Sequence, residues 1–419
     1  MDKIVVRGGT PLRGEIAVSG AKNAALPLLF ATLLTEDECY LKRVPQLADI
    51  CTTLRLLRDL GVQYEWLSDQ EVVLSARQVQ SFEAPYDLVK TMRASFLALG
   101  PLLARFGQAR VSTPGGCAIG ARPVNIHLDG MQRLGASIRL YQGYVEAETK
   151  KLHGAYIPLE FPSVGATENL IMAATLAEGE TVIDNAACEP EISDLALLLN
   201  SMGGCVSGAG TGTITIQGVS ALHGATHTVI PDRVEAGTFL TAGAITSGDV
   251  FVRDARADHL EAFLNTFTAA GIKFSIHEDG IHVVGNGRPS SLNITTLPYP
   301  GFPTDLQAQI MALLSRGEGR SMITETIFEN RFMHAQELVR LGADIHVHGN
   351  NAVINGVASL SGAPVMATDL RASVSLLLAG LAAQGTTEVS RVYHLDRGYE
   401  RIEEKLTRIG ADIRRVKKE

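Results

Sequence analysis

The sequence predicts an α/β protein of two domains, each assembled from three similar units of about 70 residues with helices inside and sheets outside. Three observations lead to this fold class. Hydrophobic residues make up 46% of the 419 residues and charged residues 20%, which is enough apolar material for a large core. Aromatic residues account for 5% while glycine occurs 41 times, and this mixture favours α/β packing with many tight connections over an aromatic-rich β-sandwich. The third observation is internal repetition, in two interleaved series of motifs.

The first series reads as an apolar helix end, a glycine and a strand of alternating residues. Glycine suits the position after a helix because the chain there usually turns into the left-handed region. Six copies recur about every 70 residues, which chance cannot easily produce in step with a second series. Their glycines are Gly61, Gly135, Gly203, Gly271, Gly342 and Gly410.

The second series reads as a helix of small residues, a turn and a strand. Its turns carry Gly107, Gly179, Gly248, Gly317 and Gly385, with Glu36 and Asp37 taking the turn of the first unit. Each unit therefore reads helix, strand, helix, strand, with further strands around them. We expect the small-residue helices to be buried on all sides, at residues 31–34, 171–177, 241–245 and 374–383.

Charge and cysteine content exclude several classes of protein. The net charge is −8, which argues against a general nucleic-acid binder, so any anionic ligand needs a local cluster of cations. Five cysteines without a CxxC pair make a disulfide framework or a structural zinc site improbable. The N-terminus does not resemble a signal peptide, and no apolar stretch approaches the ~20 residues of a membrane span. We therefore expect a cytoplasmic protein without a membrane segment.

Some motifs are better explained without a ligand. The sequence GAGTGT at residues 208–213 resembles a phosphate loop, but a strand pattern follows it, so we expect a hairpin turn. His346 and His348 share a strand face and lack a third ligand nearby, which favours surface histidines. Lys90 and Arg93 are expected one turn apart on one helix face, where solvated side chains are the default.

The segment STPGGCAIGARPVNIH contains the most suggestive cysteine, Cys117. Three glycines and a proline around it predict a loop, and Arg122 could favour its thiolate or an anionic ligand. A hairpin loop with a buried thiol explains the same pattern equally well.

Further candidates lie at expected helix starts. Lys22 and Asn23 in SGAKNAA could hold an anion, because helix N-termini present free N–H groups. Ser163 and Gly165 in FPSVGATEN suit a diphosphate, but both segments serve equally as plain helix caps.

The second half of the chain holds a carboxylate and three arginines near turns, namely Asp305, Arg331, Arg371 and Arg397. Salt bridging explains any one of the arginines, whereas the set together suggests an anion site.

Together these segments resemble the UDP-N-acetylglucosamine 1-carboxyvinyltransferase family. The resemblance runs from MDKIVVRGG to the C-terminus and includes SGAKNAALPLLFATLL, PGGCAIGARPVNIH, FPSVGATEN, NRFMH, MATDLRAS and YHLDRGYERIEEKL. It implies an inside-out α/β barrel of six repeats in two domains, with the active site in the cleft between them. The first domain, residues 22–230, would carry the Cys117 loop, and the second would comprise residues 1–21 plus 231–419.

The resemblance also implies a reaction. The enolpyruvyl group of phosphoenolpyruvate would move to the 3′-hydroxyl of UDP-N-acetylglucosamine with release of phosphate, the first committed step of peptidoglycan synthesis. The implied catalytic residues are Cys117 as general acid, Asp305 as base, Lys22 and Arg397. Phosphoenolpyruvate would contact Lys22, Asn23, Arg122, Arg331, Arg371 and Arg397. The UDP-sugar would contact Arg93, Arg122, Pro123, Val124, Asn125, Ile126, Ser163, Val164, Gly165, Asp305 and Ile327.

Two residues depart from the family pattern. Asn125 stands where many members have aspartate, which affects nucleotide affinity more than reaction type. Phe161 replaces a lysine of some members and removes one possible charged contact.

The implied enzyme needs neither metal nor other cofactor, and its partners are the two small substrates, with no nucleic acid, membrane or obligatory protein partner. Two alternatives are a shikimate-3-phosphate enolpyruvyl transferase and a non-catalytic repeat protein that binds a nucleotide sugar. The cysteine loop argues against the first, and the retained acid, base and cations argue against the second.

Overall fold

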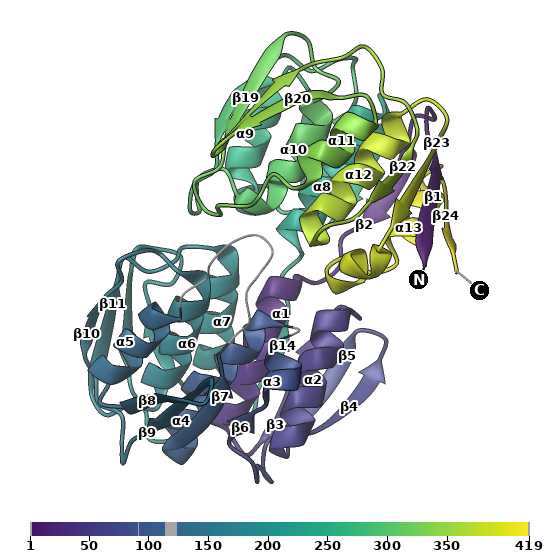
Figure 1. The fold of residues 1–419 in the computed structure, drawn as a ribbon. Coiled ribbons are helices and arrows are strands. Elements are labelled where there is room, and N and C mark those ends of the chain that lie inside the picture. The colour runs from purple at the N-terminus through teal and green to yellow at the C-terminus, as the bar shows by residue number, and fades with distance from the viewer. Residues whose placement is uncertain (1, 91, 114–123, 418–419) are drawn as a thin grey trace. The chain divides into compact units, whose positions relative to one another are not determined.

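The computed structural model describes residues 2–90, 92–113 and 124–417, which divide into two compact units (Figure 1). The N-terminal unit spans residues 20–230 and the C-terminal unit spans residues 231–417 together with residues 2–19. Each unit has a hydrophobic core of its own, and the two cores share no residue. None of the helices in the described ranges is long and apolar enough to cross a bilayer.

The described strands form six four-stranded sheets, all with one plan. The first two strands are parallel, and the third and fourth each add an antiparallel neighbour. In the N-terminal unit the strands are β14 (Thr226–Thr228), β3 (Glu38–Lys42), β5 (Glu71–Ser75) and β4 (Gln63–Ser68); β6 (Glu83–Ala84), β7 (Gln108–Ser112), β9 (Tyr144–Glu148) and β8 (Ser137–Tyr141); and β10 (Tyr156–Pro158), β11 (Glu180–Asp184), β13 (Thr213–Gln217) and β12 (Cys205–Ser207).

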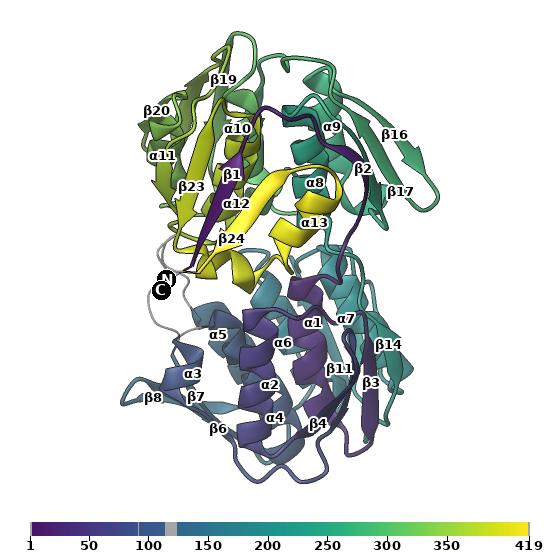
Figure 2. The ribbon, with the colours of Figure 1, turned by 90° about the vertical axis from the view of Figure 1, so that its right-hand side faces the viewer.

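The C-terminal unit repeats this plan with two strands taken from the start of the chain. β1 lies between β23 and β24, and β2 is the parallel partner of β15, which is why the first 19 residues belong to this unit (Figure 2). The sheets are β2 (Arg13–Ala17), β15 (Asp249–Arg253), β17 (Gly280–Val284) and β16 (Lys273–His277); β18 (Asn293–Thr295), β19 (Arg320–Thr324), β21 (Asn351–Asn355) and β20 (Asp344–His348); and β22 (Pro364–Met366), β23 (Thr386–Ser390), β1 (Lys3–Arg7) and β24 (Asp412–Val416).

Three helices in each unit are largely buried, and the segments predicted to be buried from their small residues, 31–34, 171–177, 241–245 and 374–383, are buried throughout. Because the strands alternate buried and exposed residues, each sheet has one face on the core and the other in solvent. The buried helices are α1 (Lys22–Ala31), α4 (Leu99–Phe106) and α6 (Val164–Thr175) in the N-terminal unit and α8 (Arg233–Ile245), α10 (Gln307–Leu314) and α12 (Leu370–Ala382) in the C-terminal unit. The predicted α/β class is confirmed.

A second set of helices covers the remaining core surface. It comprises α2 (Ala48–Leu60), α5 (Asn125–Arg133), α7 (Pro190–Ser201), α9 (Glu261–Ala269), α11 (His334–Arg340) and α13 (Ile402–Arg408). Short helical turns complete the chain: α3 (Tyr86–Val89), η1 (Thr32–Leu34), η2 (Arg93–Ala98), η3 (Ala257–His259), η4 (Thr304–Leu306) and η5 (Val392–Arg397).

The first glycine series is confirmed at every copy. All six glycines have positive φ, between 76° at Gly271 and 106° at Gly61, as the end of a helix requires. In the second series Gly248 and Gly317 do not, because Ser247 and Gly319 take the left-handed conformation instead. The predicted hairpin after Gly208 is also confirmed, since β12 and β13 pair antiparallel.

One expected helix face is wrong. Helix α3 ends at Val89, and Met92 has an extended backbone before η2 begins at Arg93. Lys90 and Arg93 therefore do not share a helix face, and Lys90 instead forms an exposed ion pair with Asp87 at 2.5 Å.

Candidate functional site

In the C-terminal unit, one carboxylate joins two of the predicted arginines. The carboxylate of Asp305 accepts hydrogen bonds from Arg331 at 2.7 Å and from Arg371 at 2.9 Å. Asp305 lies in η4 just before α10, Arg331 follows β19, and Arg371 is in the first turn of α12. Three segments that are distant in sequence thus bring one carboxylate and two guanidinium cations into one cluster.

The charges of this cluster are strongly coupled. Both guanidiniums are buried, at 5% exposure for Arg331 and 6% for Arg371. Burial alone would raise the pKa of Asp305, but Arg371, Arg331 and Arg233 outweigh it and hold the pKa far below its usual range. Asp305 in turn raises the pKa of Arg371 against the opposing effect of burial. At neutral pH the cluster therefore carries one negative and at least two positive charges.

Two buried polar atoms, one on Arg331 and one at the start of α11, have no hydrogen-bond partner among the described residues. They are Nε of Arg331 and Nε2 of His334, whose residue is 1% exposed. Burial, assisted by Arg331, lowers the pKa of His334 to about 4 although the carboxylate of Asp369 opposes the shift. Buried donors without partners usually bind a ligand or an ordered water. The Arg331 Nε–H is therefore available to an anion.

The three buried helices of this unit each begin near an aspartate, and one of the three behaves differently. Asp232 and Asp369 cap α8 and α12 by accepting hydrogen bonds from backbone N–H groups of the first turn. Asp305 makes its hydrogen bonds to arginines instead, and Pro303 occupies the cap position of η4. Asp305 thus does not cap its helix as Asp232 and Asp369 do, and its carboxylate contacts the arginines instead.

The other predicted residues of this unit lie on nearby segments. Arg397 ends η5, which packs against α12, and its side chain is half-buried. The backbone N–H of Ile327 donates to Glu325 at 2.8 Å in the turn after β19, and the ring of the neighbouring Phe328 faces Arg331.

In the N-terminal unit, Lys22 is the first residue of α1, as predicted. Its ammonium is buried and forms an ion pair with Asp49 of α2 at 3.0 Å. Asn23 follows on α1 and is half-buried. An ammonium group carries three N–H donors, so it can contact more than one acceptor at once.

A second group of predicted residues gathers around His127 of α5. Gly100 N–H donates to Asn169 Oδ1, so the Asn169 amide nitrogen faces His127 Nδ1 at 3.1 Å and the ring carries its proton on Nε2. A Cβ on Gly165 would lie 3.7 Å from that Nε2. Burial and the charge of Arg93 lower the pKa of His127 to about 3, so Arg93 is close and the imidazole is neutral.

The remaining predicted residues of this unit flank His127. Ser163 caps α6 by accepting from Ala166 N–H at 3.4 Å, and Val164 and Gly165 open that helix. Val124 precedes α5, whose first residues are Asn125 and Ile126. Cys117, Arg122 and Pro123 lie outside the described residues. Phe161 is an exposed apolar residue.

The four described cysteines are all free thiols. Burial raises the pKa of Cys39 and Cys188, and Cys51 and Cys205 are exposed on α2 and β12. No group of three acidic, histidine or cysteine residues in the described ranges could hold a metal ion.

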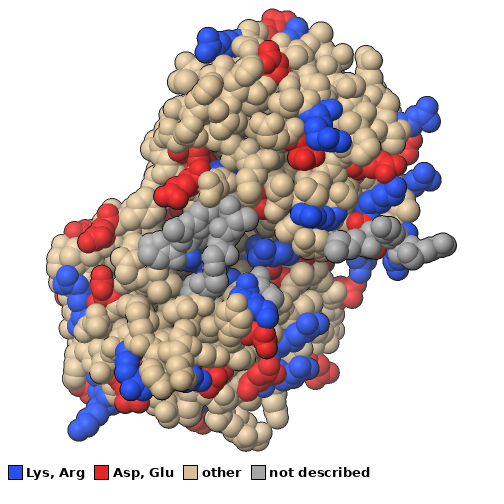
Figure 3. Space-filling model, in the orientation of Figure 1, with Lys and Arg blue, Asp and Glu red and all other residues tan. Residues whose placement is uncertain are grey.

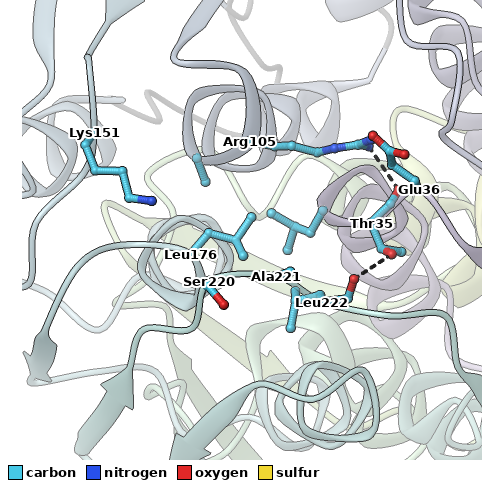
Figure 4. Close-up of a pocket in the computed structure, with 10 residues that line it drawn as sticks. Thr35, Glu36, Arg105, Lys151, Leu176, Ser220, Ala221 and Leu222 are labelled. Atoms are coloured by element: carbon cyan, nitrogen blue, oxygen red, sulfur yellow. Dashed lines mark hydrogen bonds and ion pairs between the residues drawn. The ribbon is translucent and has the colours of Figure 1, made fainter.

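A cavity of about 280 Å³ lies in the N-terminal unit, at the C-terminal ends of its central helices (Figure 4). Arg105 crosses its wall and donates to the carbonyls of Leu33 at 2.8 Å, Thr35 at 2.9 Å and Ala76 at 3.0 Å. These acceptors include the end of η1, where free carbonyls carry partial negative charge. Arg105 therefore stabilises the helix ends, and none of the predicted site residues lines this cavity.

Charged residues of both signs are intermixed on the face shown in Figure 3. The cations best placed to bind a small anion are therefore the buried ones, because low solvent exposure strengthens their interaction with a ligand.

Several residues of these clusters escaped the sequence analysis, among them Asp49, Arg233 and His334. Asp49 and Arg233 belong to ordinary helix segments, and only the fold places them near the candidate residues. The sequence did hold a signal for Arg233. Asp232, Asp305 and Asp369 stand at the same point of successive units, and Arg233 directly follows the first of them.

Comparisons with known proteins show the family to which the chain belongs. A family model described as EPSP synthase (3-phosphoshikimate 1-carboxyvinyltransferase) matches residues 6–406. The chain therefore belongs to the EPSP synthase family, the enolpyruvyl transferases. The enolpyruvyl transferase NikO from Streptomyces tendae has a similar structure, with a TM-score of 0.90 and 25% identity over 100% of this chain and 99% of that chain. EPSP synthase from Acinetobacter baumannii shares the fold, with a TM-score of 0.80 and 19% identity over both full chains.

Sequence relatives are more specific. The UDP-N-acetylglucosamine 1-carboxyvinyltransferase of Geobacter metallireducens is 56% identical over 417 residues, covering 100% of both chains. That of Granulibacter bethesdensis is 57% identical over 418 residues, covering 99% of this chain and 100% of the relative. Within the EPSP synthase family, the chain groups with the UDP-N-acetylglucosamine 1-carboxyvinyltransferases.

Proposed function

We propose that this protein is a cytoplasmic enzyme that transfers the enolpyruvyl group of phosphoenolpyruvate to the 3′-hydroxyl of UDP-N-acetylglucosamine and releases phosphate. This reaction opens peptidoglycan synthesis. The observation that carries the proposal is the pair of buried arginines around Asp305, one of which has an unpartnered N–H. Identity of 56–57% to full-length relatives, against 19% to an EPSP synthase, favours the UDP-sugar as acceptor over shikimate 3-phosphate.

The donor needs cations for two anionic groups. We assign its carboxylate to Arg331 and Arg371, whose planar guanidiniums match a carboxylate in geometry. We assign its phosphate to Lys22, Arg122 and Arg397, with Asn23 orienting it. Lys22 also begins a helix, whose N-terminus favours anions.

Asp305 is the proposed base for the sugar hydroxyl, and its environment suggests how it acquires basicity. A carboxylate held by two arginines has a depressed pKa and is a poor proton acceptor. A substrate carboxylate that binds the same guanidiniums neutralises their charge. The pKa of Asp305 then rises. Binding of phosphoenolpyruvate therefore makes Asp305 a better base for the hydroxyl of the UDP-sugar.

The chemistry proceeds by addition and elimination. Cys117 gives a proton to the methylene carbon while the sugar oxygen, losing its proton to Asp305, bonds to the central carbon of the enol. The methyl group then returns a proton as the carbon–oxygen bond to phosphate breaks, which regenerates the double bond on the product.

The UDP-sugar is assigned to residues around His127 and to the turn after β19. These are Arg93, Arg122, Pro123, Val124, Asn125, Ile126, Ser163, Val164, Gly165, Asp305 and Ile327. Because they fall in both units, we propose that the active site forms in a cleft between them. The common plan of the six sheets supports a further proposal, that the chain is an inside-out α/β barrel of six repeats.

A phosphate-release assay with different acceptors tests the function. We expect phosphate from phosphoenolpyruvate only when UDP-N-acetylglucosamine is added, and unchanged release after treatment with a chelator. Equal release with shikimate 3-phosphate, or loss of activity on chelation, would overturn the proposal.

A further inference from the structure

Glu325 is a buried glutamate that the reaction above does not use. It directly follows β19 and is 3% exposed. Its Oε1 accepts hydrogen bonds from Thr296 Oγ1 at 2.9 Å and from the backbone N–H groups of Ile327 at 2.8 Å and Phe328 at 3.1 Å. Its Oε2 accepts from Thr304 Oγ1 at 2.9 Å. One carboxylate thus joins the end of β18, the turn after β19 and η4.

The direction of these hydrogen bonds follows from the contacts of Thr296. This residue follows β18, the parallel partner of β19, so Thr296 and Glu325 lie at the carboxyl ends of neighbouring strands. Thr296 Oγ1 accepts from the N–H of Thr326 at 2.9 Å and directs its own proton to Glu325. The partners of Glu325 are therefore neutral donors, and they match the roughly four acceptor sites of a carboxylate. A carboxylate occupied in this way holds the protein together and does not itself bind a ligand.

The turn that Glu325 holds departs from the plan of the repeats. In four of the six sheets, the residue that follows the second strand has a positive φ, between 54° and 63°. These residues are Arg43, Asn185, Asp254 and Arg391. Glu325 occupies the same place after β19 but is not among the described residues with positive φ. Its side chain instead bonds to the N–H groups two and three residues ahead, which makes a different turn. A local departure from a repeated rule is expected where a functional site needs it.

The two turns that Glu325 joins carry residues assigned to the reaction. Thr304 directly precedes Asp305 in η4. Ile327 and Phe328 lie in the turn after β19, and the ring of Phe328 is 5.4 Å from the guanidinium of Arg331. Glu325 therefore connects the segment of the proposed base to a segment assigned to the UDP-sugar.

We propose that Glu325 is a positioning residue that fixes the turn of Asp305 against the turn of Ile327 and so places the base correctly for the sugar hydroxyl. This inference rests on the proposed function for the roles of Asp305 and Ile327. In the free protein, two arginines also hold the Asp305 carboxylate. Once the donor's carboxylate binds those guanidiniums, the position of Asp305 depends more on η4, which Thr304 ties to Glu325. We therefore expect Glu325 to affect the chemical step more than donor binding.

The first test removes the hydrogen bond between the two turns. Thr304→Val deletes the hydroxyl that donates to Glu325 and keeps the size of the side chain. We expect kcat to fall about tenfold, as for a lost hydrogen bond to a charged group. The KM for phosphoenolpyruvate should stay within about twofold of the wild type, because Arg331 and Arg371 keep their contacts. Thr304→Ser retains the hydroxyl and should restore kcat.

Thr326→Val is the matched control. Thr326 is exposed next to Glu325, and its hydroxyl donates to the carbonyl of Thr296 instead of to Glu325. This variant should keep kcat within about twofold of the wild type. An equal kcat for Thr304→Val and Thr326→Val would overturn the inference. A rise in the KM for phosphoenolpyruvate as large as the fall in kcat would also overturn it, because the defect would then not be confined to the base.

Glu325→Gln provides the second part of the test. The amide oxygen can serve the three donors around Oε1, while the amide nitrogen replaces the acceptor of Thr304. The contact between residues 304 and 325 is then no longer charge-assisted, so it is weaker. In this background Thr304→Val should lower kcat by no more than about twofold. A further tenfold loss would show that Thr304 acts independently of Glu325 and would contradict the inference.

A wild-type enzyme that released no phosphate would overturn the proposed function, and the tie between the turns would still be measurable by amide exchange. The N–H of Leu306 donates to the carbonyl of Pro303 at 3.0 Å in η4. It should exchange about tenfold faster in Thr304→Val than in Thr326→Val. Pyruvate, which carries the donor's carboxylate without the phosphate, should raise the melting temperature of both variants equally. Equal exchange of Leu306 in the two variants, or unequal stabilisation by pyruvate, would refute the positioning role independently of catalysis.

Discussion

Replacing Asp305 by asparagine removes the carboxylate that pairs with two buried guanidiniums. Each pair is worth about 4 kcal/mol at 4 Å between charge centres for an effective dielectric constant near 20, before the cost of desolvation. Removing one member of a buried pair typically costs about 3–5 kcal/mol, because the remaining charge is left uncompensated. Arg331 and Arg371 would both lose their partner. We therefore expect the free energy of unfolding of the C-terminal unit to fall by an amount of this size.

The location of the loss can be measured separately from its size. Trp66, the single tryptophan, lies in the N-terminal unit, whose core shares no residue with that of the C-terminal unit. The urea transition followed by Trp66 fluorescence should therefore stay unchanged. Amide exchange in α10 and α12 should accelerate on the order of 10²- to 10³-fold. Asp344→Asn is the control, because that carboxylate is exposed and contacts His346 and Asn355 at the surface instead of a buried cation.

The effect should also depend on pH with a defined sign. A depressed pKa in the folded state contributes stability above the unfolded-state value, about 3.9, and this contribution is lost as pH falls toward the folded-state pKa. The difference in unfolding free energy between the wild type and Asp305→Asn should thus shrink progressively as the pH falls below about 4. Pyruvate should stabilise the variant more than the wild type, since it no longer competes with Asp305. Equal exchange in α10 and α12 for variant and wild type at pH 7 would refute the account of this cluster.

Two further predictions concern the N-terminal unit. Cys117 should react with an epoxide phosphonate of the fosfomycin type, and the reaction should be faster with the UDP-sugar bound. If peptide mapping finds the label on exposed Cys51 or Cys205 instead, the proposed role of Cys117 is contradicted. Arg105→Met should lower the stability reported by Trp66 by about 2–4 kcal/mol, because three buried carbonyls lose their donor. The control is Arg55→Met, at an exposed arginine, and an equal midpoint of the urea transition for the two variants would refute the role of Arg105.

The repeated architecture was predictable because its signals are local. A glycine after a helix needs positive φ whatever lies around it, so the six glycines of the first series could be read from the sequence. Small residues along a whole helix indicate burial on every side for the same reason. The error at Lys90 has a local origin too, since the extended backbone of buried Met92 interrupts what the pattern suggested was one helix.

The contacts of the site were not predictable in this way. Arg331 and Arg371 were candidates, but their common partner Asp305 lies 26 and 66 residues away, and no local pattern encodes such a meeting. The partner of Lys22 is equally remote in sequence, at Asp49 on the next helix.

The most direct test of the central claim is to run the reaction in deuterated water and analyse the product by mass spectrometry. Addition and elimination pass through a methyl group that gains a solvent proton and then loses one of three. The account predicts an enolpyruvyl UDP-N-acetylglucosamine that carries deuterium on its vinyl carbon. A product formed without deuterium would contradict it.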